Sequence, residues 1–334
     1  MLDVICLGEI LVDWVSTASG VELEDCLSFT KAAGGAPANT AVGLARQGVS
    51  TGFIGRVSND SFGLWLRSIL EAENIDVQGT IVDSQSQTRM AYVVTMANGD
   101  RKLAEFSRVA CADSRLSPED LKPSMFENAS VLHFGSISLI SDTSSKATRE
   151  AIKLARSNNM IISYDPNLRL ALWSSPDVLR LTVLETLSLA DIVKINEDEL
   201  MFLTGSRTEA AADKLRSENK ITLLIITKDK HGAYFSHNQH SFDLPGFNVK
   251  LVEATGAGDG FNAGILSALL PYIKNRPNRL DALANLNKSD LQIIGTRANA
   301  IGALVCTRPG AIPALPDKLE LEKFMDAMKE RNLT

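Results

Sequence analysis

The sequence predicts a doubly wound α/β fold, in which helices flank a mainly parallel sheet and a small second β-sheet is attached. Short apolar runs alternate with segments of helical period, which predicts the main sheet. The second sheet is predicted from residues 88–107, where polar and apolar residues alternate on either side of Asn98-Gly99. We expect the 334 residues (1–334) to form a single domain.

The strands of the main sheet are predicted from apolar runs that end near a glycine or a polar residue. They are VICLG (4–8), TGFIG (51–55), SVLHFG (130–135), MIISYD (160–165), DIVKIN (191–196) and TLLIIT (222–227). Helices are predicted between them over 38–48, over 60–74 with Asp60 as N-cap, and over 144–159. Functional loops are expected at the carboxyl ends of such strands.

The Asn98-Gly99 dipeptide predicts a hairpin turn, since both residues tolerate a positive φ. Together with the strand-like residues 12–17, this hairpin would form the small second sheet. Two interpretations stay open, a surface hairpin and a lid over a site. The lid interpretation would comprise segments of about 12–30 and 86–112.

The composition excludes several classes of partner. A net charge of −6 and a pI near 5.4 argue against nucleic acid and against an anionic membrane surface, because both need a basic face. No apolar run approaches the roughly 18 residues of a membrane span. The N-terminus has no basic region typical of a signal peptide, and the cysteines are dispersed. These features predict a cytoplasmic protein.

The stretch ATGAGDGF (254–261) resembles a phosphate loop but fits neither common motif. The chain has no Gly-Lys dipeptide, so it contains no P-loop of the usual type. The glycines of 256–260 begin like a dinucleotide fingerprint, but Phe261 stands where the third glycine belongs. A nicotinamide-dependent dehydrogenase is therefore disfavoured.

A helix is predicted over 260–270, ended by Pro271, and residues 255–259, here called the anion loop, lie at its N-terminus. Free N–H groups at a helix N-terminus favour an anion. Asp259 would then act as a base that takes a proton from a hydroxyl during phosphoryl transfer. The alternative is a glycine-rich helix start in which Asp259 is only a cap.

Further motifs resemble the ribokinase-like (PfkB-type) carbohydrate kinases. The anion loop resembles the signature DTTGAGD, and AAGGAPANTAVGLARQG (32–48) resembles the other signature of that family. NEDE (196–199) resembles its NxxE element, and residues 298–316 its C-terminal nucleotide-side segment. The resemblance covers almost the whole chain and implies a ribokinase-like fold and an ATP-dependent sugar kinase.

The resemblance also implies residue roles. Asp259 would be the catalytic base, and the N–H groups of Gly256, Ala257 and Gly258 the anion hole. The sugar-binding positions would be Asp13, Gly34, Gly35, Asn39 and Arg108. The ATP-binding positions would be Asn196, Thr227, Lys228, Gly232, Gly258 and Asn299. Glu199 would organise Mg²⁺. Glu253 and Ala254 depart from the usual Asp-Thr near a monovalent-cation site, so Glu253 is a metal candidate and K⁺ dependence stays open.

Several of these residues have a simpler local interpretation. Asn39 could be only a helix cap, and Glu199 only a solvated acid in a first helical turn. Lys194 and Arg169 are interpreted as surface charges outside the catalytic set. The histidine pair at 237 and 240 is interpreted as exposed and not metal-binding.

The segment DPNLRLALW (165–173), with GGAPAN (34–39), resembles the fructokinase branch most. Fructose is the expected substrate, with 2-keto-3-deoxygluconate and ribose as alternatives. Arg89, Arg101 and Arg108 in or beside the hairpin would suit a substrate carboxylate. A kinase-like binding protein without activity is the non-enzyme alternative. Lids of this type in the family also imply a homodimer.

Overall fold

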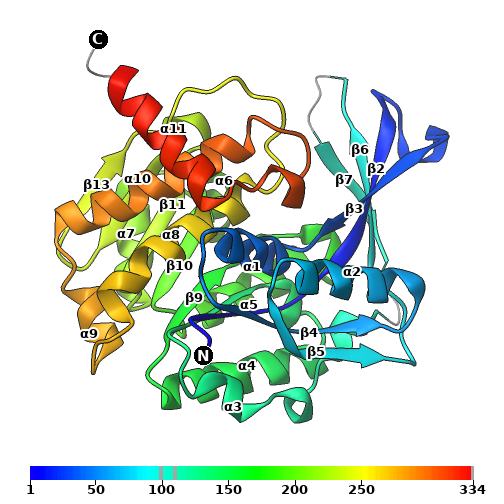
Figure 1. Cartoon of the computed structure of the whole chain (residues 1–334), viewed down its shortest axis with the longest axis horizontal. Helices are drawn as coiled ribbons and strands as arrows, with labels where there is room; N and C mark the ends of the chain where they lie inside the picture. The colour runs from blue at the N-terminus through cyan, green and yellow to red at the C-terminus, as the bar shows by residue number, and fades with distance from the viewer. Residues whose placement is uncertain (98–100, 108–110, 332–334) are drawn as a thin grey trace.

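The computed structural model of the chain describes residues 1–97, 101–107 and 111–331. Its main element is a nine-stranded sheet with the order β13-β12-β11-β10-β9-β8-β1-β4-β5. The strands of this sheet are β1 (Val4–Leu7), β4 (Thr51–Ser58), β5 (Asp76–Asp83), β8 (Val131–Gly135), β9 (Ile161–Asp165), β10 (Ile192–Asn196), β11 (Leu223–Thr227), β12 (Ala233–His237) and β13 (Ser241–Leu244). Figure 1 shows helices on both sides of this sheet.

The sheet is parallel from β11 through β5 and antiparallel at its other edge, where β12 and β13 pair. All the strands predicted from apolar runs are confirmed. Strands β5, β12 and β13 were not predicted. They are the outer strands of the sheet. Along β13 exposed and buried residues alternate, which differs from the continuous apolar runs of the inner strands.

Two hydrophobic cores cover the two faces of the sheet, because successive side chains of a strand point to opposite sides. Val4 and Cys6 lie in one core and Ile5 and Leu7 in the other. The helices on the first face are α1 (Ala36–Arg46), α2 (Ser61–Ala72), α8 (Ala257–Ile273), α9 (Arg279–Ala284), α10 (Lys288–Val305) and α11 (Lys318–Arg331). Those on the second face are α3 (Pro123–Phe126), α4 (Asp142–Ser157), α5 (Pro176–Leu187), α6 (Glu197–Thr204) and α7 (Glu209–Glu218). The doubly wound α/β class is confirmed.

The small sheet has the strand order β3-β2-β6-β7 and stands to one side of the main body (Figure 1). Its strands are β2 (Leu11–Ser19), β3 (Phe29–Gly34), β6 (Met90–Thr95) and β7 (Arg101–Phe106). The antiparallel pairing of β6 with β7 confirms the predicted hairpin, and β2 joins it in parallel to β6. The turn dipeptide Asn98-Gly99 lies outside the described residues.

The predicted helix starts agree in part with the structure. Asp60 caps α2, since its carboxylate accepts bonds from the N–H groups of Phe62 and Gly63 at 3.0 and 2.8 Å. The prediction that Pro271 ends its helix is wrong, because α8 continues to Ile273. Proline so near a helix end removes a single hydrogen bond, and buried Ile273 keeps the last turn packed against the core.

Within the described residues, no helix is both long and apolar enough to cross a membrane.

Candidate active site

The N-terminus of α8 lies beside the carboxyl ends of the central strands, and most of the predicted site residues lie there. Asp259, in the first turn of α8, is 9% exposed. Its Oδ2 accepts a hydrogen bond from Asn39 Nδ2 of α1 at 2.8 Å. Asn39 is therefore not a helix cap. Gly35 holds the N-cap position of α1, and the Asn39 side chain reaches across to the carboxylate.

Burial raises the pKa of Asp259 to about 6, while the hydrogen bond from Asn39 lowers it. The nearby Asp165 carboxylate raises the pKa further, and the positive charges of Lys194 and Arg169 lower it. A pKa about one unit below neutral leaves Asp259 ionised at pH 7 yet basic enough to accept a proton. The geometry therefore suits a general base.

The anion loop offers backbone donors beside that base. Gly256 has φ 81°, a left-handed conformation that glycine adopts without strain, and it caps α8. The N–H groups of Gly256, Gly258 and Asp259 donate to no other group in the described part of the chain. The N–H of Ala257 differs, because it donates to Ala254 O at 3.1 Å. In this conformation, only two of the three expected anion-hole donors are available.

A buried charged cluster underlies the anion loop, and sequence analysis missed it. Asp165 Oδ2, at the end of β9, accepts from Lys194 Nζ of β10 at 3.0 Å and from Asn262 Nδ2 of α8 at 2.7 Å. The interpretation of Lys194 as a surface charge is wrong, since the residue is 8% exposed. A lysine within an apolar strand must find a buried partner, and this was the signal available in DIVKIN.

Glu199 and Asn196 form a capping box at the start of α6. Asn196 Oδ1 accepts from the Glu199 N–H at 2.8 Å, and Glu199 Oε2 accepts from the Asn196 N–H at 2.9 Å. Glu199 Oε1 accepts from the Leu168 N–H at 2.8 Å. Glu199 is 7% exposed, so the interpretation as a solvated acid is wrong. Burial and the charge of Asp165 raise the pKa of Glu199, against the Lys194 charge and these N–H bonds, which lower it.

The oxygen atoms of Glu199 are the candidate ligands for the expected Mg²⁺. No group of three metal-binding side chains occurs among the described residues. Each carboxylate oxygen of Glu199 already accepts one backbone N–H and retains a second lone pair. Such oxygens suit Mg²⁺ that keeps its waters and is bound mainly by nucleotide phosphates. The residues fit that mode of binding.

The expected sugar-binding residues lie where the small sheet meets α1. Asp13 of β2 is close to Gly34, and a Cβ on Gly34 would overlap its carboxylate. Gly35 follows at the N-cap of α1. Burial raises the pKa of Asp13 to about 6, and the charges of Arg169 and Arg101 lower it. A half-buried carboxylate beside open backbone is a suitable acceptor for sugar hydroxyls.

Arg169 also belongs to this region. Its guanidinium lowers the pKa of both Asp13 and Asp259, so it lies near both carboxylates. The residue is half-buried, so it is not a fully exposed charge, and its place outside the catalytic set stays a prediction. The available signal was its position just after the end of β9, in a loop where functional groups are expected.

Glu253 lies just before the anion loop and contacts the small sheet. Its Oε2 is 2.7 Å from Arg101 Nη2 of β7 and accepts from the Gly310 N–H at 3.0 Å. Its Oε1 is buried and has no hydrogen-bond partner among the described residues. One oxygen therefore remains available to a cation, although a guanidinium already neutralises the carboxylate.

The expected nucleotide-binding residues lie along the edge formed by β11 and α10. Thr227 ends β11, and Gly232 follows in a tight turn beside residues 244–246. The Asn299 amide of α10 donates to Pro245 O at 3.0 Å. Lys228 pairs with Asp243 at 2.6 Å and Glu209 at 3.1 Å. Its ammonium is thus already neutralised in this conformation.

The remaining predictions are resolved separately. Arg108 lies outside the described residues. The interpretation of His237 as exposed is wrong: the residue is buried in β12, and its Nε2 lies 3.0 Å from Leu283 O. His240 is half-buried. Neither histidine belongs to a metal-binding group among the residues described.

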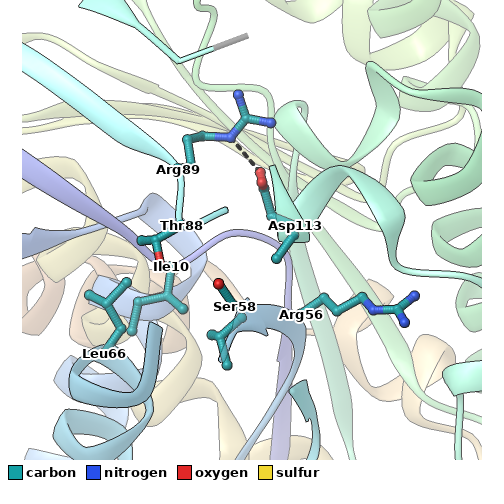
Figure 2. Close-up of a pocket in the computed structure, with 9 residues that line it drawn as sticks. Ile10, Arg56, Ser58, Leu66, Thr88, Arg89 and Asp113 are labelled. Carbon is teal, nitrogen blue, oxygen red and sulfur yellow. Dashed lines mark hydrogen bonds and ion pairs between the residues drawn. The ribbon is translucent and has the colours of Figure 1, made fainter. Parts of the chain in front are cut away.

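A buried ion pair joins the small sheet to the main body, as Figure 2 shows. Arg89 Nε and Asp113 Oδ2 are 2.6 Å apart, and Arg89 also donates to Ser107 O at 2.9 Å. These contacts hold together the two ends of the β6–β7 hairpin. The crevice here has no space for a water molecule. This region is therefore a structural contact between the hairpin and the main body, and not a ligand site.

Comparisons with known proteins agree with this geometry. The family model described as pfkB family carbohydrate kinase matches residues 1–318. The chain is 41% identical over 320 residues to probable fructokinase-6, chloroplastic, of Arabidopsis thaliana, covering 94% of this chain and 80% of that one. It is also similar to the crystal structure of fructokinase with bound ATP from Xylella fastidiosa, with a TM-score of 0.88, 27% identity and coverage of 98% and 99%.

A fructokinase double mutant from Vibrio cholerae O395, solved with fructose, ADP and potassium ion, gives a TM-score of 0.83. It is 31% identical, with coverage of 97% of this chain and 98% of that chain. The family and the ribokinase-like fold expected from the sequence motifs are confirmed.

Proposed function

Since the chain belongs to the pfkB family of carbohydrate kinases, we propose that it transfers the γ-phosphoryl group of ATP to a primary hydroxyl of D-fructose, giving D-fructose 6-phosphate. The observation that carries this proposal is the buried Asp259 carboxylate, bonded to Asn39 and adjacent to the free N–H groups of the anion loop. A carboxylate and free N–H groups side by side support transfer to a neutral hydroxyl, which needs both a base and an anion hole.

In the proposed mechanism, Asp259 takes the proton of the fructose 6-hydroxyl as that oxygen attacks the γ-phosphorus. The new oxygen–phosphorus bond forms while the bond to the β-phosphate oxygen breaks, and ADP leaves. The N–H groups of Gly256 and Gly258 stabilise the charge on the transferring group. The hydrogen bond from Asn39 keeps the Asp259 carboxylate oriented. Asp13 and the backbone at Gly34 and Gly35 hold the sugar hydroxyls.

Mg²⁺ would be organised by Glu199 and Asn196, and when bound it would neutralise phosphate charge. Asn196, Thr227, Lys228, Gly232 and Asn299 would line the nucleotide edge. For Lys228 this requires its ammonium to leave Asp243 or Glu209, to which it is now paired.

We propose Glu253 as a carboxylate at a cation position beside the anion loop. Its partnerless buried Oε1 supports this role, and the adjacent Arg101 guanidinium opposes a strong K⁺ requirement. The expected result is turnover that changes less than about twofold when Na⁺ replaces K⁺, because the guanidinium already supplies positive charge. Loss of turnover without K⁺ would contradict this.

The small sheet, within about 12–30 and 86–112, is proposed as the lid of a single kinase domain. It carries Asp13 of the sugar site and contacts the segment before the anion loop through Arg101. Closing over the sugar would exclude water and limit hydrolysis of ATP. Through this sheet we also propose a homodimer, which light scattering after size-exclusion chromatography measures directly. A monomer at micromolar concentration would contradict it.

We propose a cytoplasmic location as well. The free thiols of Cys6, Cys26 and Cys306 support a reducing compartment. Imaging of a fluorescent fusion tests this, and organellar fluorescence would overturn it.

The choice of fructose rests on the similarity to chains named as fructokinases and on the neutralisation of the lid arginines. Arg101 is paired with Glu253 and Arg89 with Asp113, so neither is free for a substrate carboxylate. Arg169 differs, because it makes no ion pair within the described residues. This guanidinium keeps 2-keto-3-deoxygluconate as the second candidate.

The test is a coupled ADP-release assay of the purified chain with fructose, ribose, 2-keto-3-deoxygluconate and adenosine, each with K⁺ and with Na⁺. We expect the highest kcat/KM for fructose. A higher value for the keto acid would transfer the assignment to the second candidate. No activity with any sugar would support a kinase-like protein that only binds.

A further inference from the structure

Lys194 is the buried cation of the site, and the roles assigned so far do not use it. It lies in β10, two residues before Asn196, between the buried apolar residues Val193 and Ile195. Its ammonium is paired with Asp165 at 3.0 Å, and both side chains are almost fully buried, 10% and 3% exposed. Burying two charges carries a large desolvation penalty that their attraction need not recover, so such a pair does not by itself show that the fold is stabilised.

The position of the ammonium points to the anion loop. A Cβ built on Gly258 would lie 3.0 Å from Lys194 Nζ, with no other atom closer. The absence of a side chain at Gly258 therefore leaves the ammonium open to the loop whose N–H groups would bind phosphate. Asp259, the proposed base, is also close enough that its charge raises the pKa of Lys194.

The hydrogen bonds of Lys194 are incomplete. An ammonium has three N–H donors, and one of them bonds to Asp165 Oδ2. No second acceptor for Lys194 Nζ occurs among the described residues. The same Asp165 oxygen also accepts from Asn262, which lies three residues after Asp259 on α8. The pair is thus tied to the helix that carries the base.

The charge of Lys194 follows from its partner. Its ammonium donates to the Asp165 carboxylate at 3.0 Å, and both side chains are buried, so the two form an ion pair in which Lys194 is positively charged.

We propose that Lys194 donates to the transferring phosphoryl group of the nucleotide, and that Asp165 and Asn262 position its ammonium for this contact. This rests on the proposed kinase function, and it names a further residue for the same reaction. Negative charge develops on the phosphoryl oxygens during transfer, and a fixed ammonium in a water-poor site stabilises that charge. The same ammonium stabilises bound ADP less. Lys194 would act together with the N–H groups of the anion loop.

The first test measures nucleotide affinity, so it does not depend on the identity of the sugar. AMP-PNP and ADP are titrated calorimetrically, with Mg²⁺ present, into wild type and Lys194→Met. We expect the Kd of AMP-PNP to rise about 10-fold, the scale of a hydrogen bond to a charged group, and the Kd of ADP to change much less. Lys274→Met is the matched control, because Lys274 also pairs with an aspartate, Asp3, but its own side chain is 45% exposed.

A second test distinguishes contact of Lys194 with phosphate from neutralisation of Asp165 by Lys194. The same titrations are made with Asp165→Asn and with the double variant Lys194→Met/Asp165→Asn. Because the double variant has no uncompensated carboxylate, it also guards against failure to fold. If Lys194 contacts the phosphoryl group, its replacement weakens AMP-PNP relative to ADP in both backgrounds.

Two results would overturn the proposal. One is an unchanged ratio of AMP-PNP to ADP affinity in Lys194→Met. The other is a change confined to the background that retains Asp165, which would mean that Lys194 only neutralises that carboxylate. Both results are distinguishable from failure of the proposed kinase function. In that case the wild-type protein would phosphorylate no sugar. Lys194→Arg, which keeps the charge, should recover part of the AMP-PNP affinity.

Discussion

At the scale of single residues, the site depends on a carboxylate whose pKa is set by opposing influences. Burial raises the pKa of Asp259 to about 6, and the Asn39 hydrogen bond counteracts part of that rise. Asn39 thus lowers the pKa of the proposed base. Its replacement should move the pH dependence of the reaction and not only its rate.

Asn39→Leu should shift the acid limb of the kcat/KM profile to higher pH. The base works in its ionised form, and the lost N–H donor favoured that form, so its pKa rises above about 6. In wild type, activity should fall below about pH 6, and Asp13, with a similar pKa, should steepen the fall. The measurement is the kcat/KM profile between pH 5 and pH 8 by ADP release.

Thr40→Val is the control, because the Thr40 hydroxyl contacts the backbone oxygen of Asp259 and not its carboxylate. Its acid limb should coincide with that of wild type. An acid limb in Asn39→Leu that also coincides with wild type would show that Asn39 does not set the pKa of the base.

The residue scale also shows where sequence reasoning stopped. Asp259 and Glu199 were predicted as site residues because they lie in recognisable motifs. The buried cluster of Lys194, Asp165 and Asn262 was not predicted, because its hydrogen bonds join residues on separate elements. A single chain gives no distance between the ends of two strands. The lysine in a buried strand was a usable signal, since such a charge requires a partner.

At the scale of elements, the small sheet is connected to the segment before the anion loop by one ion pair. Arg101 of β7 reaches Glu253, which lies a few residues before the anion loop. This contact couples the position of the sheet to the loop that would hold phosphate. The pair should therefore affect how well the sheet retains a sugar.

Arg101→Gln should raise the KM for fructose by about tenfold, the scale of a lost hydrogen bond between charged groups, with a smaller effect on kcat. The reason is that the small sheet loses its bond to Glu253 at 2.7 Å. Steady-state kinetics with varied fructose measure this. Lys102→Gln is the matched control, since Lys102 is the exposed neighbour on the same strand. Equal KM values for the two variants would contradict the coupling.

Elements were predicted well where their pattern was strong. The inner strands are continuous apolar runs, which identifies buried parallel strands. The hairpin of β6 and β7 was predicted from its alternation. Edge strand β5 was missed because its sequence, DVQGTIVD, mixes polar residues into a partly exposed strand. The N-terminus of α8 was placed too late, since glycines disguise a helix start that Gly256 caps.

At the scale of the whole molecule, the buried carboxylate of Asp259 lowers the free energy of unfolding. A buried carboxylate whose folded pKa is raised binds its proton more tightly in the folded than in the unfolded state. Stability is therefore lost as the pH rises from the unfolded pKa, 3.8, to about 6. Above that range, Asp259 destabilises the fold by about 3 kcal/mol at most.

Asp259→Asn should accordingly be more stable than wild type at pH 7, by a few degrees in Tm. The amide has no charge to bury, and it can keep a hydrogen bond to Asn39. The gain should vanish near pH 4, where the wild-type carboxylate is protonated. Thermal unfolding at both pH values measures this, with the exposed Asp25→Asn as control. A Tm of Asp259→Asn below that of wild type at pH 7 would contradict this, because it would show that Asp259 stabilises the fold.

The same variant gives the most direct test of phosphoryl transfer by general-base catalysis. Its kcat with fructose and ATP is measured by ADP release, together with calorimetric Kd values for fructose and AMP-PNP. We predict that kcat falls by ~10²-fold or more, the scale of a general base, while both Kd values stay within about threefold of wild type. A kcat near that of wild type, with binding intact, would contradict the role of Asp259 as the base.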